Sequence, residues 1–248
     1  FRSLLTTMKP NLSNQHTLFW ASKGLEVDSG LLLHEVLKSV LPQHQRYGVV
    51  SGPTFAAEVA KGLPTAMTTA ANNIQLAQTV ANLFQGNNFR VYTCDDIVGV
   101  ELGGAIKNVL AIAAGISDGL GYGANARAAI ITRGLAEIIR LGQSMGAKAE
   151  TLMGLAGVGD LVLTCTDNQS RNRRFGLAIG QGTPRDVAMA DIGQAIEGLK
   201  SSHSIGCLAD KYAVDMPICQ HVYRILYEDF PPHQAVKALL SRSLKSEF

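Results

Sequence analysis

Apolar and polar positions alternate in two different ways along this chain of 248 residues. Up to residue 97, short apolar runs bounded by turn-forming residues alternate with segments whose apolar residues recur at helical spacing. This alternation is typical of a parallel β-sheet covered by helices. The predicted strands span residues 17–21, 47–50, 65–70 and 89–92, and the predicted helices span residues 31–41, 55–61 and 74–84.

After residue 97, strand signals become rare and apolar residues recur mainly at helical spacing. We therefore predict an α/β domain over residues 1–97, followed by an all-α domain over residues 98–248. The predicted helices of the second domain span residues 98–116, 124–145, 147–155, 173–180, 205–212, 217–227 and 232–241.

The longest apolar stretch, residues 98–116, contains Glu101, Lys107 and Asn108. Such polar side chains favour a buried core helix over a transmembrane helix, so we expect no insertion into a membrane. Residues 1–8 read as the end of a helix that is already under way, so we expect the chain to begin inside its fold.

Composition and the spacing of histidines and cysteines add four expectations. The chain is 46% hydrophobic and 17% charged, which is typical of a globular protein with a large core. A formal net charge of +2 gives no excess for nonspecific binding of nucleic acid or of an anionic membrane. The histidines show no metal-ligand spacing, so no metal is assigned. The cysteines form no CxxC pair, which predicts reduced thiols in a cytosol; they are Cys94, Cys165, Cys207 and Cys219.

Lys107 interrupts the apolar pattern of its helix. Its neighbours at three and four positions are mostly small: Gly103, Gly104, Leu110 and Ala111. Open space around a desolvated lysine would lower its pKa toward neutrality, as a general acid requires. An equally compatible interpretation is a structural lysine at a domain boundary, whose ammonium reaches solvent.

A second group of polar residues follows a glycine-rich segment. Asp160 lies beside glycines that allow close backbone approach, and Ser170 can cap a helix that begins with Arg171 and Asn172. A helix start with a guanidinium and an amide would bind a phosphate. The alternative is a solvated basic helix face, for which the following residues Arg173 and Arg174 are better candidates than Arg171.

Two predicted strands end in glycine-containing turns, one with Lys23 and the other with Gly52 and Thr54. Ligands of open α/β sheets bind outside the carboxyl ends of strands, which makes both turns candidate contacts. In the order of these groups, the sequence resembles the bacterial-type NAD(P)-dependent glycerol-3-phosphate dehydrogenases. The blocks that carry the resemblance are Trp20-Ala-Ser-Lys23-Gly24-Leu25-Glu26, Ser51-Gly52-Pro53-Thr54-Phe55-Ala56, Val100-Glu101-Leu102-Gly103-Gly104-Ala105-Ile106-Lys107-Asn108, Ser170-Arg171-Asn172-Arg173 and Gly193-Gln194-Ala195-Ile196-Glu197-Gly198.

The resemblance implies a Rossmann-type sheet domain followed by a helical substrate domain. It also implies hydride transfer between NADP or NAD and a phosphorylated triose, for phospholipid synthesis. We expect a homodimer because two-fold dimers are the commonest soluble oligomers, and the cysteine pattern predicts a cytoplasmic location. Lys107 would be the proton donor or acceptor. The other implied substrate contacts are Lys23, Gly52, Thr54, Asp160, Ser170, Arg171 and Asn172, and the implied cofactor contacts are Lys23, Ala56, Arg171, Ala195 and Glu197.

The family also begins with a strand and a G-x-G-x-x-G/A turn, which these 248 residues do not contain. We therefore expect the first part of the dinucleotide-binding domain to lie before Phe1, and this stretch alone to bind cofactor poorly or to be inactive. Two alternatives remain open at this point. One is a related 3-hydroxyacid or 6-phosphogluconate dehydrogenase, and the other is a non-catalytic nucleotide-binding protein with the same fold.

Overall fold

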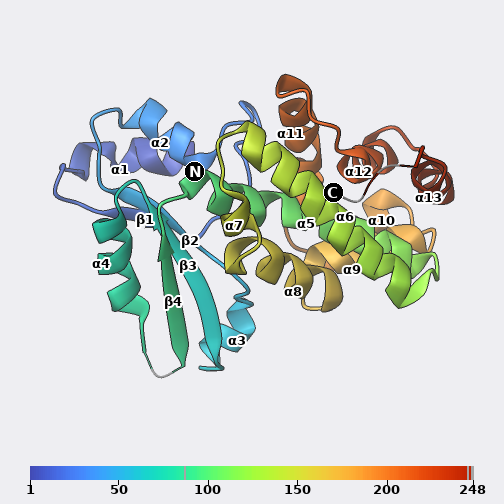
Figure 1. The fold of residues 1–248 in the computed structure, drawn as a ribbon, viewed down its shortest axis with the longest axis horizontal. Helices are drawn as coiled ribbons and strands as arrows, with labels where there is room; N and C mark the ends of the chain where they lie inside the picture. The colour runs from blue at the N-terminus through green and yellow to red at the C-terminus, as the bar shows by residue number, and fades with distance from the viewer. Residues whose placement is uncertain (87, 245, 247–248) are drawn as a thin grey trace.

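A four-stranded sheet and a bundle of helices lie side by side in the computed structural model (Figure 1), which describes residues 1–86, 88–244 and 246. The sheet has the order β1 (Leu18–Trp20), β2 (Tyr47–Ser51), β3 (Thr65–Ala71) and β4 (Phe89–Cys94). β1 and β2 run parallel, and so do β3 and β4. β2 and β3 run antiparallel, with Ser51 opposite Thr68.

The prediction of a wholly parallel sheet is therefore wrong for the central pair of strands. The segment between β2 and β3 contains one helix, α3 (Ala56–Ala60), of five residues. A helix of that length spans only about 7.5 Å. It is too short to return the chain along β2, as a parallel crossover requires, so the chain turns back and forms an antiparallel pair.

Helices cover both faces of the sheet. On one face, α1 (Arg2–Met8) and α2 (Leu33–Val40) pack over β1 and β2, where Trp20 and Val49 are buried. On the other face, α4 (Ile74–Phe84) packs against β3 and β4. Strand side chains point alternately to the two faces, and accordingly Trp20 joins the cluster under α2 whereas Phe19 packs with the residues of α4.

Helix α5 (Ile97–Gly119) is the centre of the second part of the molecule. It begins where Asp96 accepts a hydrogen bond from the backbone N–H of Gly99 at 2.8 Å, which is a side-chain cap. Apolar residues lie on every side of the helix, as expected of a helix that is surrounded by others, although a few polar side chains interrupt them. By length and hydropathy it could cross a membrane, but nearly all of its apolar stretch is buried inside the protein, which confirms the prediction of a core helix.

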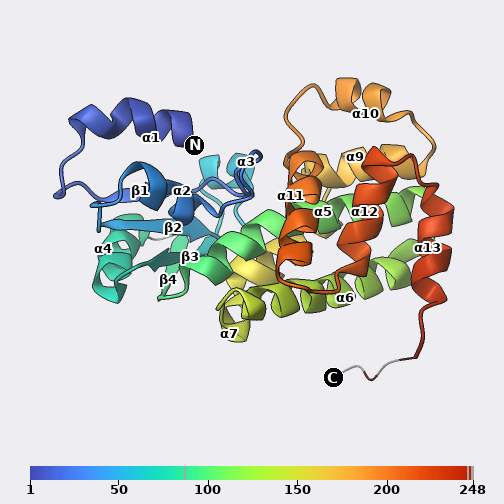
Figure 2. The same cartoon turned by 90° about the horizontal axis from the view of Figure 1, so that it is seen from above.

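Most of the helices that follow α5 in the chain pack directly against it, and the others pack on the outside of those (Figure 2). The apolar pattern predicts some of these helices better than others, because some helices bury small or polar side chains and have no continuous apolar stripe. The predicted helix at residues 205–212 begins at residue 197, since the first turns bury serines and glycine. Besides the short segments η1 and η2, two helices were not predicted, α8 and α10. The bounds are η1 (Lys9–Asn11), α6 (Gly123–Ser144), α7 (Ala149–Leu152), η2 (Leu155–Gly159), α8 (Asp160–Thr166), α9 (Arg171–Gly180), α10 (Arg185–Ile192), α11 (Glu197–Lys211), α12 (Pro217–Tyr227) and α13 (Pro232–Leu240).

Glycines allow α9 to approach α5 closely. A Cβ atom added to Gly115 would lie 2.1 Å from the carbonyl oxygen of Arg173, and one added to Gly176 would lie 2.2 Å from that of Ile112. Both distances are far below van der Waals contact, and the obstructing atoms belong to the backbone. The two helices must therefore separate if either glycine gains a side chain.

We expect Gly115→Ala to lower the free energy of unfolding by about 1–3 kcal/mol, the usual effect of overpacking a core. Urea denaturation followed by circular dichroism measures this change. Gly206→Ala is the matched control, because Gly206 lies in helix α11 with no atom within 4 Å of the added Cβ. The control is expected to be neutral or slightly stabilising, since alanine is the better helix former. Equal losses in the two variants would contradict the packing argument.

Candidate functional site

Lys107 lies in the middle of α5 and is buried, with 7% of its surface exposed. Its ammonium donates hydrogen bonds to the Asp160 carboxylate and, at 3.1 Å, to the Thr164 hydroxyl. Burial lowers the pKa of Lys107 to about 8, the nearby Asp160 carboxylate opposes that change, and the neighbouring positive charge of Lys23 adds to it. The side chain thus ends inside the protein, and its ammonium can lose a proton near neutral pH.

Asp160 joins three distant parts of the chain. It is the first residue of α8, and only 1% of its surface is exposed. One carboxylate oxygen accepts from Lys107, and the other accepts from Lys23 Nζ at 2.6 Å. Lys23 follows β1 and also donates to the Gly52 carbonyl oxygen beyond β2, at 3.1 Å. The Lys107–Asp160–Lys23 cluster therefore lies where the carboxyl ends of β1 and β2 meet the helical part of the molecule.

Two glycines provide space for this cluster. A Cβ atom on Gly104 would lie 3.2 Å from the Lys23 side chain and 3.3 Å from the Ser51 hydroxyl, so the bare backbone of α5 gives Lys23 room to reach Asp160. Gly52 has a φ of +153°, and a Cβ atom there would lie 2.9 Å from the backbone of Met67. Glycine is accordingly required in the turn that offers its carbonyl group to Lys23.

A second group of hydrogen-bonded side chains begins one residue further along α5, at Asn108. The Asn108 amide donates to the Glu197 carboxylate at 3.1 Å, and its oxygen accepts from Asn172 at 2.9 Å. The Asn172 oxygen in turn accepts from the backbone N–H of Gly198 at 2.9 Å. This group fixes the first turns of α9 and α11 against α5, directly beside the lysine cluster.

The start of α9 matches the predicted cap. Ser170 is buried, and its hydroxyl accepts from the backbone N–H of Arg173 at 3.2 Å. Arg171 is only partly buried, and its guanidinium donates to the Gln194 side chain at 3.2 Å. The suggestion that Arg173 lies on a solvated face is wrong, because Arg173 is 8% exposed and forms a 2.5 Å ion pair with Asp118.

The other predicted contacts lie around this centre. Thr54 is partly buried, and its hydroxyl donates to the Gly52 carbonyl oxygen at 3.2 Å. Ala56 is exposed at the start of α3, and Ala195 is exposed in the loop before α11. The structure thus brings nine of the predicted residues into the two hydrogen-bonded groups, the capped helix start or the adjoining turn; they are Lys23, Gly52, Thr54, Lys107, Asp160, Ser170, Arg171, Asn172 and Glu197.

Thr164 was not predicted as a site residue, although it is 3% exposed and accepts from Lys107. Its hydroxyl also donates to the Asp160 carbonyl oxygen, one helical turn earlier, at 2.6 Å. The i, i+4 spacing of the two residues contains the relevant signal. It becomes visible only when residues 160–166 are recognised as a helix, which the apolar pattern did not indicate.

The chemistry of the described residues suits ligands that carry phosphate groups. Lys23 is a partly buried cation and Arg171 is a second cation, nearer the surface, at the start of a capped helix. A buried lysine with a pKa of about 8 beside them suits proton transfer. These side chains fit both a phosphorylated substrate and part of a dinucleotide.

A Rossmann-type sheet joined to a helical domain, with a buried lysine at their junction, is typical of the two-domain nicotinamide-dependent dehydrogenases. The sequence matches the N-terminal region of the NAD-dependent glycerol-3-phosphate dehydrogenases over residues 1–77 and their C-terminal region over residues 96–237. The chain belongs to the NAD-dependent glycerol-3-phosphate dehydrogenase family.

Individual relatives support the same assignment. The chain is 54% identical to the glycerol-3-phosphate dehydrogenase [NAD(P)+] of Psychromonas ingrahamii and 55% identical to that of Thioalkalivibrio sulfidiphilus. Both matches cover the whole chain and 74% of the relative. The crystal structure of glycerol-3-phosphate dehydrogenase from Coxiella burnetii matches with a TM-score of 0.93 and 53% identity, over 97% of this chain and 74% of that one.

Proposed function

We propose that the protein interconverts dihydroxyacetone phosphate and sn-glycerol 3-phosphate, with NAD or NADP as the cofactor. The observation that carries this proposal is the buried Lys107–Asp160–Lys23 cluster. In the direction of reduction, the C2 carbonyl carbon gains a hydride and its oxygen gains a proton. The bound nicotinamide supplies that hydride, and the protein supplies the proton.

Lys107 is the proposed proton donor. As the carbonyl oxygen becomes negative, an ammonium in a water-poor site stabilises the charge and then transfers its proton. Asp160 holds the Lys107 Nζ in place through one oxygen and Lys23 through the other. In the direction of oxidation, the neutral Lys107 amine accepts the proton from the C2 hydroxyl. A pKa of about 8 allows both protonation states near neutral pH.

The phosphate end of the substrate is assigned to the start of α9. Arg171 would pair with the phosphate, while Asn172 and the capping Ser170 would fix the helix start and contribute polar contacts. The turn with Gly52 and Thr54 would line the same side as Lys23. Binding energy from the phosphate would then hold the reacting carbon near Lys107.

The cofactor would lie along the open side of the same junction. Lys23 and Arg171 would supply positive charge to it, and the exposed residues Ala56, Ala195 and Glu197 would contribute contacts. In this arrangement, residues 1–97 belong to the dinucleotide-binding domain and residues 98–248 form the substrate domain.

The remaining elements of the proposal concern the cellular role. A homodimer in the cytoplasm would supply glycerol 3-phosphate for phospholipid synthesis. Steady-state assays with dihydroxyacetone phosphate, a 3-hydroxyacid and 6-phosphogluconate test the assignment. We expect turnover with dihydroxyacetone phosphate at least 10³-fold more efficient than with either alternative, in line with sites that depend on a specific polar contact. Absence of turnover with all three substrates, in a protein that also carries the G-x-G-x-x-G/A turn of the family, would favour a non-catalytic protein.

Arg171→Ala is expected to raise the KM for dihydroxyacetone phosphate by about 10-fold or more, the value of one or two charge-assisted hydrogen bonds. Turnover of unphosphorylated dihydroxyacetone should change little, because that substrate has no dianion to pair with Arg171. Arg174→Ala is the matched control, since Arg174 is exposed on the same helix. Equal losses on the two substrates would point to a folding or cofactor role for Arg171.

A further inference from the structure

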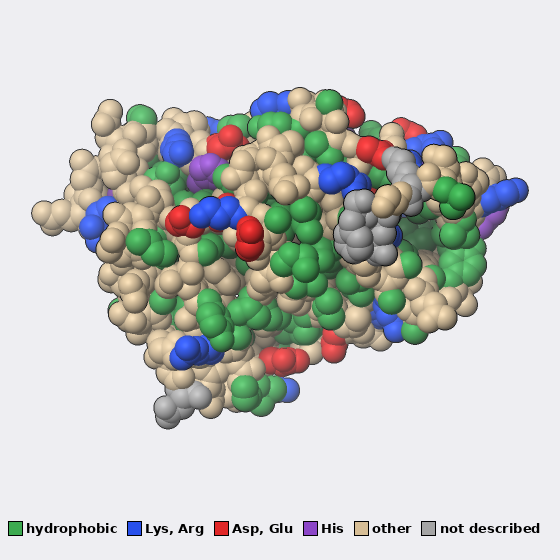
Figure 3. Space-filling view, viewed as in Figure 1, with side chains coloured by type: hydrophobic (Ala, Val, Ile, Leu, Met, Phe, Trp, Pro, Cys, Tyr) green, Lys and Arg blue, Asp and Glu red, His purple; other side chains and the backbone are tan. Residues whose placement is uncertain are grey.

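Glu101 is a buried carboxylate that the proposed mechanism does not use. On the face of the molecule seen in Figure 3, acidic and basic side chains are scattered over the surface, where water solvates them. Glu101 lies instead inside the protein, on α5, with 5% of its surface exposed. A carboxylate in such a place is costly unless hydrogen-bond donors surround it. Its partners therefore indicate its role.

Three donor groups from the sheet part of the molecule surround the Glu101 carboxylate. One oxygen accepts from the Trp20 indole N–H at 3.2 Å and from the backbone N–H of His34 at 3.0 Å. The other oxygen lies 2.6 Å from His34 Nδ1. Burial raises the pKa of Glu101, and the hydrogen bonds from His34 and Trp20 oppose that rise. The carboxylate thus connects α5 with the end of β1 and with the start of α2.

The hydrogen bond from the His34 backbone replaces a missing helix cap. α2 begins after Leu32, whose side chain has no oxygen to accept from the first backbone N–H groups of the helix. Glu101 supplies that acceptor from another helix, 67 positions further along the chain than His34. A carboxylate there also suits the positive end of the α2 dipole. The position of Glu101 therefore fixes the start of α2.

Trp20 and His34 stand at the two ends of the loop that carries Lys23. Trp20 is the last residue of β1, α2 begins at Leu33, and residues 21–32 between them form no helix or strand. One carboxylate therefore anchors both ends of this loop, on the same helix that carries Lys107. The six positions between Glu101 and Lys107 span about 9 Å of helix, so Glu101 holds the loop from outside the lysine cluster.

We propose that Glu101 is a positioning residue, which holds the loop of residues 21–32 against α5 so that the Lys23 ammonium meets Asp160 beside Lys107. Apolar packing would bury this region at less cost, but it has no direction, whereas hydrogen bonds to both ends of the loop fix it in one position. The proposal rests on the proposed function, because Lys23 contributes to catalysis only if the lysine cluster is the active site.

Acetylation of Lys23 by acetic anhydride, followed by mass spectrometry, tests the position of the loop without an assay of activity. Methionine in Glu101→Met keeps the length of the side chain but does not hold the loop by hydrogen bonds. We expect Lys23 to leave Asp160 and to be acetylated about 10-fold faster, the value of one hydrogen bond to a charged group. An unchanged rate in a folded Glu101→Met variant would overturn the proposal.

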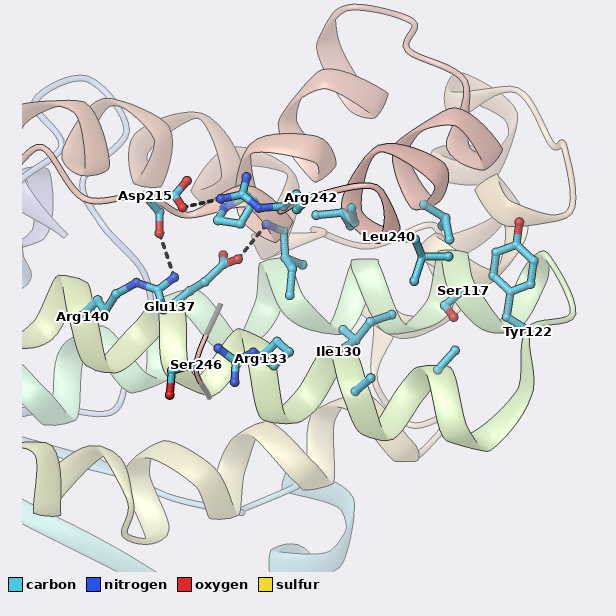
Figure 4. A pocket seen from close by; sticks show the side chains of 16 residues that line it. Ser117, Tyr122, Ile130, Arg133, Glu137, Arg140, Asp215, Leu240, Arg242 and Ser246 are labelled. Carbon is cyan, nitrogen blue, oxygen red and sulfur yellow. Dashed lines mark hydrogen bonds and ion pairs between the residues drawn. The ribbon is translucent and has the colours of Figure 1, made fainter. Parts of the chain in front are cut away.

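Glu137→Met is the matched control. Glu137 of α6 is 1% exposed, and its carboxylate likewise accepts two backbone N–H groups at the start of a helix, from Ile218 at 2.7 Å and from Cys219 at 3.2 Å (Figure 4). That helix is α12, which is not connected to the Lys23 loop. The control should lose stability while Lys23 keeps its acetylation rate. Equal acceleration in the two variants would show a general loosening of the fold and would also overturn the proposal.

Steady-state kinetics with dihydroxyacetone phosphate test whether Glu101 acts through Lys23, in a protein that also carries the G-x-G-x-x-G/A turn of the family. Glu101→Met should lower kcat/KM about 10-fold, and Glu101→Gln should recover most of this loss, because its amide oxygen can still accept from Trp20 and His34. In a Lys23→Met background, Glu101→Met should change kcat/KM little, since the residue on which it acts is already absent. Additive losses would contradict the proposal.

A milder variant and the acetylation assay keep the test decisive. If Glu101→Met does not fold, Trp20→Phe removes only the hydrogen bond at the start of the loop and keeps an aromatic ring in the core. Lys23 should then be acetylated faster than in the unchanged protein, and an equal rate would overturn the proposal. If the unchanged protein does not turn over dihydroxyacetone phosphate, the proposed function fails, whereas acetylation of Lys23 still measures whether Glu101 positions the loop.

Discussion

Replacing Lys107 by methionine is expected to lower kcat by about 10²-fold or more, the usual effect of removing a general acid. Methionine keeps the length and apolar character of the lysine stem while it deletes the charge. The fold should survive, because the stem packs in an apolar helix and the lost ammonium leaves a carboxylate that still pairs with Lys23. Steady-state kinetics in the direction of reduction, with thermal unfolding of the same sample, measure both effects.

The pH dependence gives this experiment its sharpest readout. With a pKa of about 8, Lys107 loses its proton as the pH rises through that value. In the proposed mechanism, reduction requires the ammonium, so kcat should fall above pH 8, whereas oxidation requires the neutral amine and should gain rate there. The fall in the reduction rate and the rise in the oxidation rate near pH 8 should both be absent from the residual activity of Lys107→Met. Both should be present in the control Lys237→Met, because Lys237 is exposed. A near-normal kcat in Lys107→Met, or an unchanged dependence of its rates on pH near 8, would remove Lys107 from the mechanism.

The fold was predictable where local pattern determines it. The bounds of α4 agree with the predicted helix at residues 74–84, because its apolar spacing and the Asn73 cap are both local signals. Strand direction is not local. The antiparallel pairing of β2 with β3 depends on how far α3 can carry the chain, which only the three-dimensional connection determines.

Helix α8 shows a second limit of sequence patterns. Its residues include valine, threonine and cysteine, which have weak helix propensity, and packing against α5 overrides that preference. Because this helix was not predicted, the i, i+4 relation of Asp160 and Thr164 was not recognised either. Local propensity therefore underestimates helices whose stability comes from burial around a central helix.

The chemistry of the site was predictable in part. Lys107 was identifiable because a lysine in an apolar helix must have partners or lose its charge. The identity of those partners was a matter of tertiary structure. Lys23 and Asp160 are 137 residues apart, and nothing in the spacing of either indicates that one carboxylate would hold two lysines. The catalytic and binding roles of these residues remain predictions until the variants are measured.

Asp160→Asn is expected to damage stability and catalysis together. Asparagine keeps the size of the side chain but removes the negative charge that binds both Lys107 and Lys23. Removing one partner of a buried ion pair typically costs about 3–5 kcal/mol, because the remaining charge is left uncompensated. Urea denaturation at pH 7 measures this loss, with the exposed Asp191→Asn as the control.

The catalytic effect of Asp160→Asn has a definite sign. Asp160 favours the charged form of Lys107, so its loss moves the pKa of Lys107 below about 8. The fraction of ammonium at pH 7 then falls, and the decline of the reduction rate with rising pH should begin at a lower pH than in the unchanged protein. A stable variant whose reduction rate still declines near pH 8 would show that Asp160 does not control the protonation of Lys107. A decline that begins at a lower pH, with an unchanged KM, would instead identify Asp160 as the residue that sets the proton affinity of Lys107.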